Sequence, residues 1–342
     1  MFVVGLVVNG AGLRAAETPL AQDAAATALA KEVAGKGWIL FAAKTDQGDY
    51  DLWLSRPNGS QLKNLTRTPE VSEFGGRFSP DGRQMFYRRQ KKGEDLNHDL
   101  WGAIGVPMLA DADGAHPKVL GGDGDLPWAS WSPDGHQVAC LYRREGKIRI
   151  LDLQTKAVVK ELPRQGIFQQ LFWSPDGKRL CGTANVDGHD WNILSIELES
   201  GKTTLLTRQL NCTANWFQAD PNRVIYSHRT PGLGSDYGWT MLMQATADGK
   251  SRTLIYGERG RHIYYGCMSP DDRYVLFARP ESDGGTDANM ALMRLADGPV
   301  VVPDDYQQLK ALYPEAKSGP VLQLTLAGFE PHWTYAEIGG TR

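Results

Sequence analysis

The stretch Trp131-Ser132-Pro133-Asp134-Gly135 decides the fold of this chain, because it recurs. Phe78-Ser79-Pro80-Asp81-Gly82 precedes it, Trp173-Ser174-Pro175-Asp176-Gly177 follows it, and Met268-Ser269-Pro270-Asp271-Asp272 is a fourth copy. Residues 217–222 form a degenerate fifth copy. In each copy the proline presets φ for a tight turn, the aspartate bonds nearby backbone groups, and the glycine closes the turn without steric cost. A short apolar run follows every turn, so each copy predicts a β-hairpin.

The spacing of the copies, roughly 40–50 residues, is typical of propellers and solenoids. The first repeat lacks its opening strand, because residues 38–42 have no such turn ahead of them. Residues 331–336 can supply it, since Trp333 there occupies the place of Trp131 and Trp173. A C-terminal strand that completes the N-terminal blade closes a ring and removes exposed sheet edges. We therefore predict an all-β, six-bladed β-propeller of four-stranded antiparallel blades at residues 38–66, 74–120, 127–163, 168–208, 213–256 and 262–303.

Composition agrees with a turn-rich globular protein. The chain has 342 residues, 41% of them hydrophobic, with 38 glycines, 19 prolines and a net charge of −3. This nearly neutral balance gives no reason to expect a nucleic-acid partner. The four cysteines show no Cys-x-x-Cys spacing, so we expect buried free thiols rather than disulfides or a structural zinc site.

The two ends of the chain carry segments outside the repeats. Residues 1–16 read as a signal peptide, which predicts a periplasmic or secreted protein without a membrane span; a disordered or strand-forming N-terminus is the alternative. Residues 17–36 read as a linker or a short alanine-rich helix, and the propeller domain then covers 37–342. Residues 304–313 have helical spacing and predict a surface helix that caps the sixth blade or docks a partner, with 321–326 returning as an outer strand.

The repeats resemble a known family. The Phe/Trp-Ser-Pro-Asp-Gly hairpin, together with Asp51-Leu52-Trp53 and Asp99-Leu100-Trp101, resembles the PD40 (WD40-like) repeat of TolB-type β-propellers over residues 37–336. This resemblance implies the fold and does not transfer the partner of the Tol system, because TolB carries an extra N-terminal α/β domain for which we find no room. Prolyl oligopeptidases have a similar propeller, but the chain shows no Gly-x-Ser-x-Gly strand–turn–helix signal.

A candidate site is expected on the propeller face opposite the hairpins, where second strands end and first strands begin. Arginine presents a planar fork suited to carboxylate, sulfate or phosphate, and aromatic rings stack on sugars. We therefore predict a pocket for an acidic saccharide or a peptide C-terminus. The alternative is a solvated rim in which the arginines pair with Glu73, Glu94, Glu145 and Glu330. The predicted ligand-binding residues are Glu73, Arg89, Trp128, Arg144, His228, Arg229, His262, Arg279, Glu330 and His332.

The resulting functional expectation is a monomeric scaffold that binds a protein or an anionic glycan, without catalytic residues, cofactor or metal. The alternative is a metal-assisted, lyase-like enzyme acting on an acidic saccharide, in which His228, His262 and His332 hold a divalent ion. Oligogalacturonate lyases are propellers with similar hairpins and a histidine-rich metal site. The chain lacks the close His-x-His pair that such sites favour, so their ligands cannot be carried over residue by residue.

Overall fold

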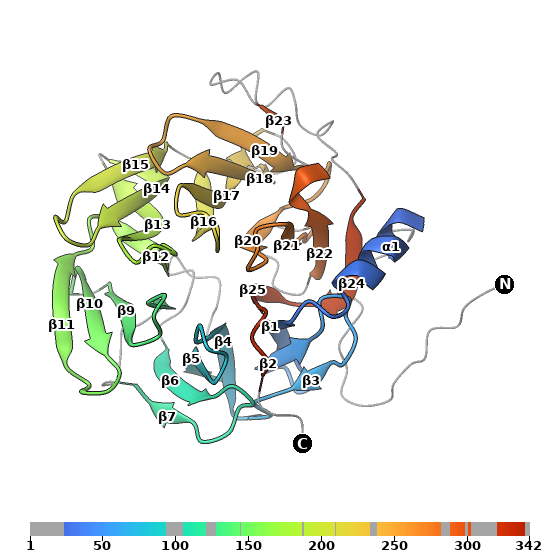
Figure 1. The fold of residues 1–342 in the computed structure, drawn as a ribbon, viewed down its shortest axis with the longest axis horizontal. Helices are drawn as coiled ribbons and strands as arrows, with labels where there is room; N and C mark the ends of the chain where they lie inside the picture. Colours follow the sequence, from blue (N-terminus) through green and yellow to red (C-terminus); the bar gives the residue numbers. More distant parts are fainter. Residues whose placement is uncertain are drawn as a thin grey trace.

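The computed structural model describes residues 24–93, 105–120, 128–143, 145–186, 188–208, 210–232, 238–281, 288–297, 300–301 and 320–338. Within these residues, six antiparallel sheets stand around a central axis, with the first strand of each blade innermost (Figure 1). The predicted six-bladed β-propeller is therefore confirmed. No helix in the described part of the chain is long and apolar enough to cross a membrane.

The blades are numbered from the one that holds both ends of the domain. The first three are, from the axis outward, β25 (Phe329–Thr334), β1 (Trp38–Lys44), β2 (Tyr50–Ser55) and β3 (Lys63–Asn64); β4 (Val71–Phe78), β5 (Gln84–Lys91), β6 (Val106–Asp111) and β7 (Lys118–Val119); and β8 (Ala129–Trp131), β9 (Gln137–Tyr142), β10 (Lys147–Asp152) and β11 (Val158–Pro163).

The other three blades follow in chain order. They are β12 (Ile167–Trp173), β13 (Arg179–Val186), β14 (His189–Glu197) and β15 (Thr203–Thr207); β16 (Asn211–Trp216), β17 (Arg223–Thr230), β18 (Trp239–Thr246) and β19 (Arg252–Tyr256), with β23 (Val300–Val301) as a fifth strand; and β20 (Tyr264–Met268), β21 (Tyr274–Ala278), β22 (Asn289–Arg294) and β24 (Leu322–Ala327).

The ring closes where the sequence predicts. Strand β25 pairs antiparallel with β1, so that Ile39 lies opposite Trp333. The Trp333 indole is fully buried and donates a hydrogen bond to the Lys36 carbonyl over 2.7 Å. The C-terminal segment is thus the innermost strand of the N-terminal blade.

The sixth blade differs from its predicted bounds. Val300–Val301 pairs with β19 of the fifth blade, while the outer strand of the sixth blade is β24, close to the predicted 321–326. Strand β24 is long enough to pair the edge of β22 and to bury Leu322 and Leu324, whereas two residues only cover part of a neighbouring edge. The predicted helix at 304–313 lies outside the described residues.

Within 17–36, the structure shows the short alanine-rich helix that the sequence offers as the alternative to a linker. This is helix α1 (Ala24–Val33), which lies beside β24 on the outside of the ring (Figure 1). Leu29 and Val33 join the hydrophobic core beneath it, and Glu32 forms an ion pair with Arg294. The helix therefore packs as part of the propeller, because its apolar residues are buried against the first and sixth blades. Residues 1–16, the expected signal peptide, lie outside the described part of the chain.

The hairpins have the hydrogen bonds that their residues predict. Ser79 Oγ donates to Asp81 Oδ1 over 2.6 Å, and the same Ser–Asp bond recurs at residues 132 and 134, 174 and 176, and 269 and 271. In the fourth copy Asp272 replaces glycine at φ +56° and its carboxylate accepts three backbone N–H groups of the degenerate fifth hairpin. The two irregular copies therefore stabilise one another.

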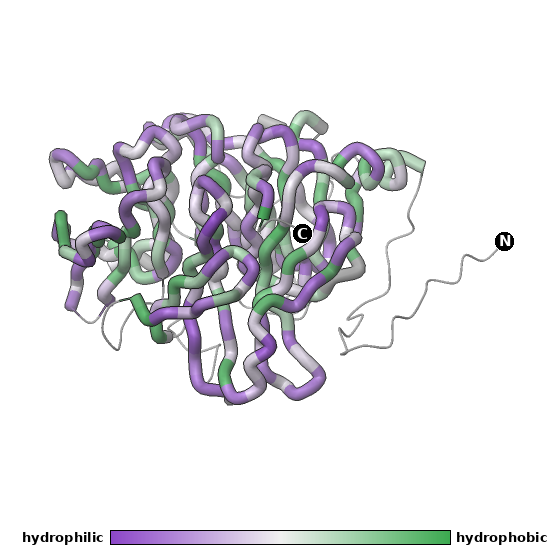
Figure 2. Tube along the Cα trace, turned by 60° about the horizontal axis from the view of Figure 1, so that its bottom comes forward, coloured by the Kyte–Doolittle hydropathy of each residue, from purple (hydrophilic) through white to green (hydrophobic). Residues whose placement is uncertain are grey.

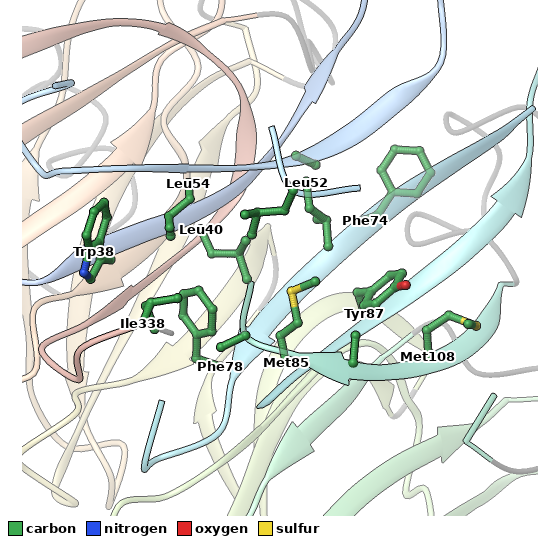
Figure 3. Close-up of a cluster of buried hydrophobic side chains, with 14 of the residues drawn as sticks. Trp38, Leu40, Leu52, Leu54, Phe74, Phe78, Met85, Tyr87, Met108 and Ile338 are labelled. Atoms are coloured by element: carbon green, nitrogen blue, oxygen red, sulfur yellow. The ribbon is translucent and has the colours of Figure 1, made fainter. Parts of the chain in front are cut away.

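Hydrophobic cores lie between neighbouring blades. Figure 3 shows the one between the first and second blades, where Leu40 and Leu52 face Phe74, Phe78 and Met85. In the tilted view of Figure 2 the coloured parts of the chain at the bottom are mostly hydrophilic, as solvent-facing connections should be. All four cysteines are buried and free, which confirms the prediction for them.

Candidate functional site

The six innermost strands β4, β8, β12, β16, β20 and β25 line the propeller axis, and their residues recur in register. Strands β4, β8, β12, β16 and β20 end in Phe, Trp or Met before a hairpin, and in β25 Trp333 takes this place one residue before the strand ends. The residue directly before each of these six occupies the equivalent position in its blade. Five of these residues are half-buried and line one cavity; we call them the floor residues: Arg77, Ser130, Phe172, Asn215 and His332. The sixth, Cys267, is buried.

The cavity above the floor residues holds about 400 Å³ and opens on the hairpin face. Its rim is formed by the prolines of four hairpins, Pro80, Pro133, Pro175 and Pro270. We call this cavity the funnel. The funnel therefore lies on the hairpin face, whereas the sequence predicts a pocket on the opposite face, several of whose connecting loops lie outside the described residues.

The tryptophans of the repeated motif hold the blades together. Trp131 Nε1 donates to the Arg77 carbonyl and Trp216 Nε1 to the Phe172 carbonyl, each over 3.1 Å. Each of these two bonds joins one blade to the blade before it, whereas the Trp333 bond ties the C-terminal strand to Lys36, just ahead of β1 in the same blade. The polar edges of these three indoles are therefore used within the fold, and only their apolar parts border the funnel.

Arg77 carries the charge of the funnel. Its Nη1 donates to the carbonyls of Gly76 (2.7 Å) and Glu330 (3.0 Å), and its guanidinium lies 5.3 Å from the centre of the Phe172 ring. Desolvation lowers its pKa, although a guanidinium stays protonated in proteins. Among the described residues that line the funnel none is Asp or Glu. The charge of Glu330 raises the pKa of Arg77 and so offsets part of the desolvation, but Glu330 lies outside this lining and is paired with Arg88.

His332 adds a neutral donor to the same floor. Its Nδ1 accepts the backbone N–H of Phe78 over 3.0 Å, so the remaining ring proton is on Nε2. Desolvation, and secondarily the positive charge of Arg77, lowers the pKa of His332 to about 3. The ring is therefore uncharged near neutral pH, and the funnel keeps a single positive charge.

Below the floor residues the axis is nearly closed. Arg88 Nη2 contacts both carboxylate oxygens of Glu330 at 2.8 and 2.9 Å, both side chains are only 3% exposed, and the Arg88 guanidinium lies 4.3 Å from the centre of the Trp128 ring. Gly75 leaves room for this pair, since a Cβ there would come within 3.2 Å of the Arg88 guanidinium. A cavity of only about 10 Å³ remains between Arg77, Trp128 and Gln170.

Most predicted site residues are engaged in contacts within the protein. Glu73 and Arg89 pair at 3.1 Å, and Arg279 contacts both Glu258 oxygens at 2.6 Å and Gln323 at 3.1 Å. The Glu73–Arg89 and Arg88–Glu330 pairs match the alternative given above, in which the arginines of the rim pair with glutamates. Glu145 instead pairs with Arg149, and Glu94 and Arg144 lie outside the described residues.

The other predicted residues sit in separate places. His228 is buried and its Nδ1 lies 2.8 Å from Asn211 Oδ1, His262 stacks on Tyr264, and Arg229 lies between the rings of Trp191 and Tyr264 at 5.1 and 5.7 Å. His332 lines the funnel instead, so the three histidines of the alternative metal site do not come together. In the described ranges, no three His, Cys, Asp or Glu side chains come close enough to hold a metal ion.

Comparisons with known proteins place the fold. No protein-family model matches the chain, and no curated protein matches it. The crystal structure of TolB from Acinetobacter baumannii aligns with a TM-score of 0.62 and 18% identity over 88% of this chain and 67% of that one. The chain has a TolB-like β-propeller fold.

Two further solved structures agree with this fold. A putative TolB from Agrobacterium tumefaciens aligns with a TM-score of 0.53 and 19% identity over 75% of this TolB-like propeller and 84% of that chain. A chain of a nidogen/laminin complex aligns with a TM-score of 0.57 and 10% identity over 86% and 97% of the two chains. At these identities the likeness concerns the fold alone.

Sequence reasoning missed Arg77 as a funnel residue of this TolB-like propeller. The signal was present, because Arg77, Ser130, Phe172 and His332 each directly precede the motif's aromatic residue. A strand's side chains alternate in direction, so one aromatic that points into the blade implies a neighbour that points to the axis. The prediction instead used the far ends of the strands, where the charged residues were more numerous.

Glu73 gives the TolB-like propeller an unusual dependence of stability on pH. It is fully buried, and desolvation raises the pKa of its carboxyl from 4.5 to about 7 despite bonds from Thr68 and Arg89. Because the folded pKa exceeds the unfolded one, this group's contribution is fully present below pH 4.5 and is lost as pH rises through 7, by about 3 kcal/mol at most.

Glu73→Gln cannot ionise and is therefore expected to be stabilised relative to the natural protein at pH 8 and not at pH 4. Urea unfolding at several pH values measures the difference, with the exposed Glu199→Gln as control. If the free energy of unfolding changed with pH in the same way for Glu73→Gln and for the natural protein, the raised pKa of Glu73 would be contradicted.

Proposed function

We propose that this TolB-like propeller is an exported, monomeric binding module that receives a segment of a partner protein in its funnel. The observation that carries the proposal is the funnel itself, a cavity of about 400 Å³ on the propeller axis with an apolar rim and a polar floor. Export is supported by the apolar run that ends in small residues within 1–16.

The lining of the funnel supports a protein segment rather than a sugar. Its walls combine proline rings at the rim with the half-buried rings of Phe172, Trp173 and Tyr335. Concave, mostly apolar sites with a few polar groups are typical of specific ligand pockets. The funnel narrows to a floor with room for a small polar group, which suits the tip of a polypeptide better than a pyranose ring lying flat.

A peptide selection tests the proposal. Random peptides displayed with either a free carboxyl end or a free amino end are selected on the natural protein and then measured by calorimetry. Asn215→Trp, which fills the floor, is expected to abolish binding of the selected peptides. Val159→Trp, on the outer strand β11 where Val159 is 51% exposed, should leave it unchanged.

Equal binding to both variants would place the peptide site outside the funnel and overturn the proposal. Circular dichroism and thermal unfolding of both variants establish that each is folded. An array of acidic oligosaccharides serves as the competing arm: funnel-dependent binding of a saccharide without any of a peptide would replace the proposed partner by a glycan.

A further inference from the structure

The floor of the funnel offers hydrogen-bond donors and one positive charge, without a negative group. Arg77 uses only Nη1 in bonds to described residues, which leaves Nε and Nη2 available. His332 offers Nε2–H, and the Asn215 amide makes no hydrogen bond to a described residue. Such a set suits an oxyanion, because guanidinium and carboxylate form charge-assisted bonds about twice as strong as neutral ones.

A second observation lies directly behind the floor. The cavity of about 10 Å³ is lined by Arg77, Phe172 and Asn215, which also line the funnel, so the two spaces meet at the guanidinium. Two of its lining side chains, Trp128 and Gln170, are 4% and 2% exposed, and their Nε1 and Nε2 donors have no hydrogen-bond partner among the described residues. Buried donors without a partner are costly, and a space of about 10 Å³ has room for one water-sized acceptor that would bridge them to a group bound at the floor.

From these observations we infer that the group inserted into the funnel is a carboxylate of the partner's polypeptide, bound by Arg77 and His332 at the floor. This inference rests on the proposed function and names the chemistry of its ligand. The buried Arg88–Glu330 pair and Trp128 lie below the floor, where the described residues leave a space of only about 10 Å³, so the inserted segment presents an end or a loop tip. Both a C-terminal carboxyl and an Asp or Glu side chain meet this requirement.

The surroundings of residue 77 suit an arginine that binds a carboxylate. Phe172 packs against one side of the guanidinium and two carbonyls hold Nη1, so the donor fork is oriented before any ligand arrives. A carboxylate that binds there pays little ordering cost on the protein's side. A cation would meet the positive charge of Arg77 and no carboxylate in the described lining, so the site selects by charge as well as by size.

The test uses peptides selected on the natural protein. Amidating the C-terminus of a peptide removes its terminal carboxylate, and changing its Asp and Glu to Asn and Gln removes the side-chain carboxylates. Whichever modification removes the inserted carboxylate should weaken peptide binding about 10–100-fold. Arg77→Gln should weaken binding of the unmodified peptide by a similar factor and make it insensitive to that modification. Arg77→Lys, which keeps the charge and loses the fork, should recover part of the loss.

The matched control is Arg83→Gln, which removes a positive charge from an 86% exposed side chain on the same face and should leave binding unchanged. Propionate and propionamide provide an arm that needs no selected peptide. Propionate should shift the His332 ring signals in the NMR spectrum of the natural protein and not of Arg77→Gln, and propionamide should shift neither.

The outcomes separate the two proposals. Funnel-dependent peptides whose binding ignores both carboxylate modifications and Arg77→Gln would overturn the inference and leave the proposed function standing. A propionate effect that needs Arg77, without any funnel-dependent peptide, would support the anion site and overturn the protein-binding function. Absence of both effects would overturn both.

Discussion

Replacing Trp333 with alanine is expected to lower the free energy of unfolding by about 3–5 kcal/mol, because it removes a fully buried indole from the seam that closes the ring. Trp333 packs against Tyr274 and Tyr335 and bonds to the Lys36 carbonyl. These contacts join the last strand of the chain to the sixth blade, through Tyr274, and to the segment between α1 and β1, through Lys36. Urea unfolding followed by circular dichroism measures the loss.

Trp333→Phe separates the hydrogen bond from the packing. It keeps an aromatic ring and loses the 2.7 Å bond, and we expect a loss of about 1 kcal/mol for the bond in addition to the smaller ring. Trp173→Phe is the matched control, since Trp173 Nε1 has no hydrogen-bond partner in the described residues. If Trp333→Ala unfolded like the natural protein, the C-terminal strand would not be what closes the ring.

Glu330→Gln is expected to cost about 3 kcal/mol of stability, because it leaves the Arg88 guanidinium buried without its carboxylate. Both side chains are 3% exposed, so water cannot replace the lost partner easily. The double variant Arg88→Met/Glu330→Gln removes the charge together with the carboxylate. It should therefore be less destabilised than the sum of the two single changes.

A double-mutant cycle measures this coupling between Arg88 and Glu330, which should exceed about 1 kcal/mol for a buried, directly bonded pair. Arg149→Met and Glu145→Gln form the control cycle, since that pair is more exposed, with Glu145 at 45%, and should couple by less than about 1 kcal/mol. Additive effects at Arg88 and Glu330 would mean that the pair does not hold the axis closed.

Much of the fold could be predicted because its signals are local. A Ser-Pro-Asp-Gly turn specifies a hairpin from within five residues, and the Ser79–Asp81 bond shows the mechanism. The closure at Trp333 was predictable because the repeat itself lacked one strand. The pairing of Val300–Val301 with the fifth blade was not predictable. The partner of a two-residue strand depends on which sheet edges the other strands leave open.

The candidate site was harder to predict. Arg89 and Arg279 were correctly assigned to strand ends, yet each is held by a glutamate, Glu73 or Glu258. Sequence position does not reveal whether a charged side chain meets a partner from another strand. Arg77, with no carboxylate nearby in the described lining of the funnel, looked no different in the sequence from the paired arginines.

The sequence by itself determined the hairpins, the number of blades and the closure of the ring, because turn chemistry and strand periodicity act over a few residues. Only the tertiary structure shows that the hairpin face holds the funnel. The funnel exists because the Arg88–Glu330 pair and Trp128 fill one side of the axis while the floor residues stop short of filling the other. That difference depends on the packing of side chains from six strands spread over the whole chain, which no single segment encodes.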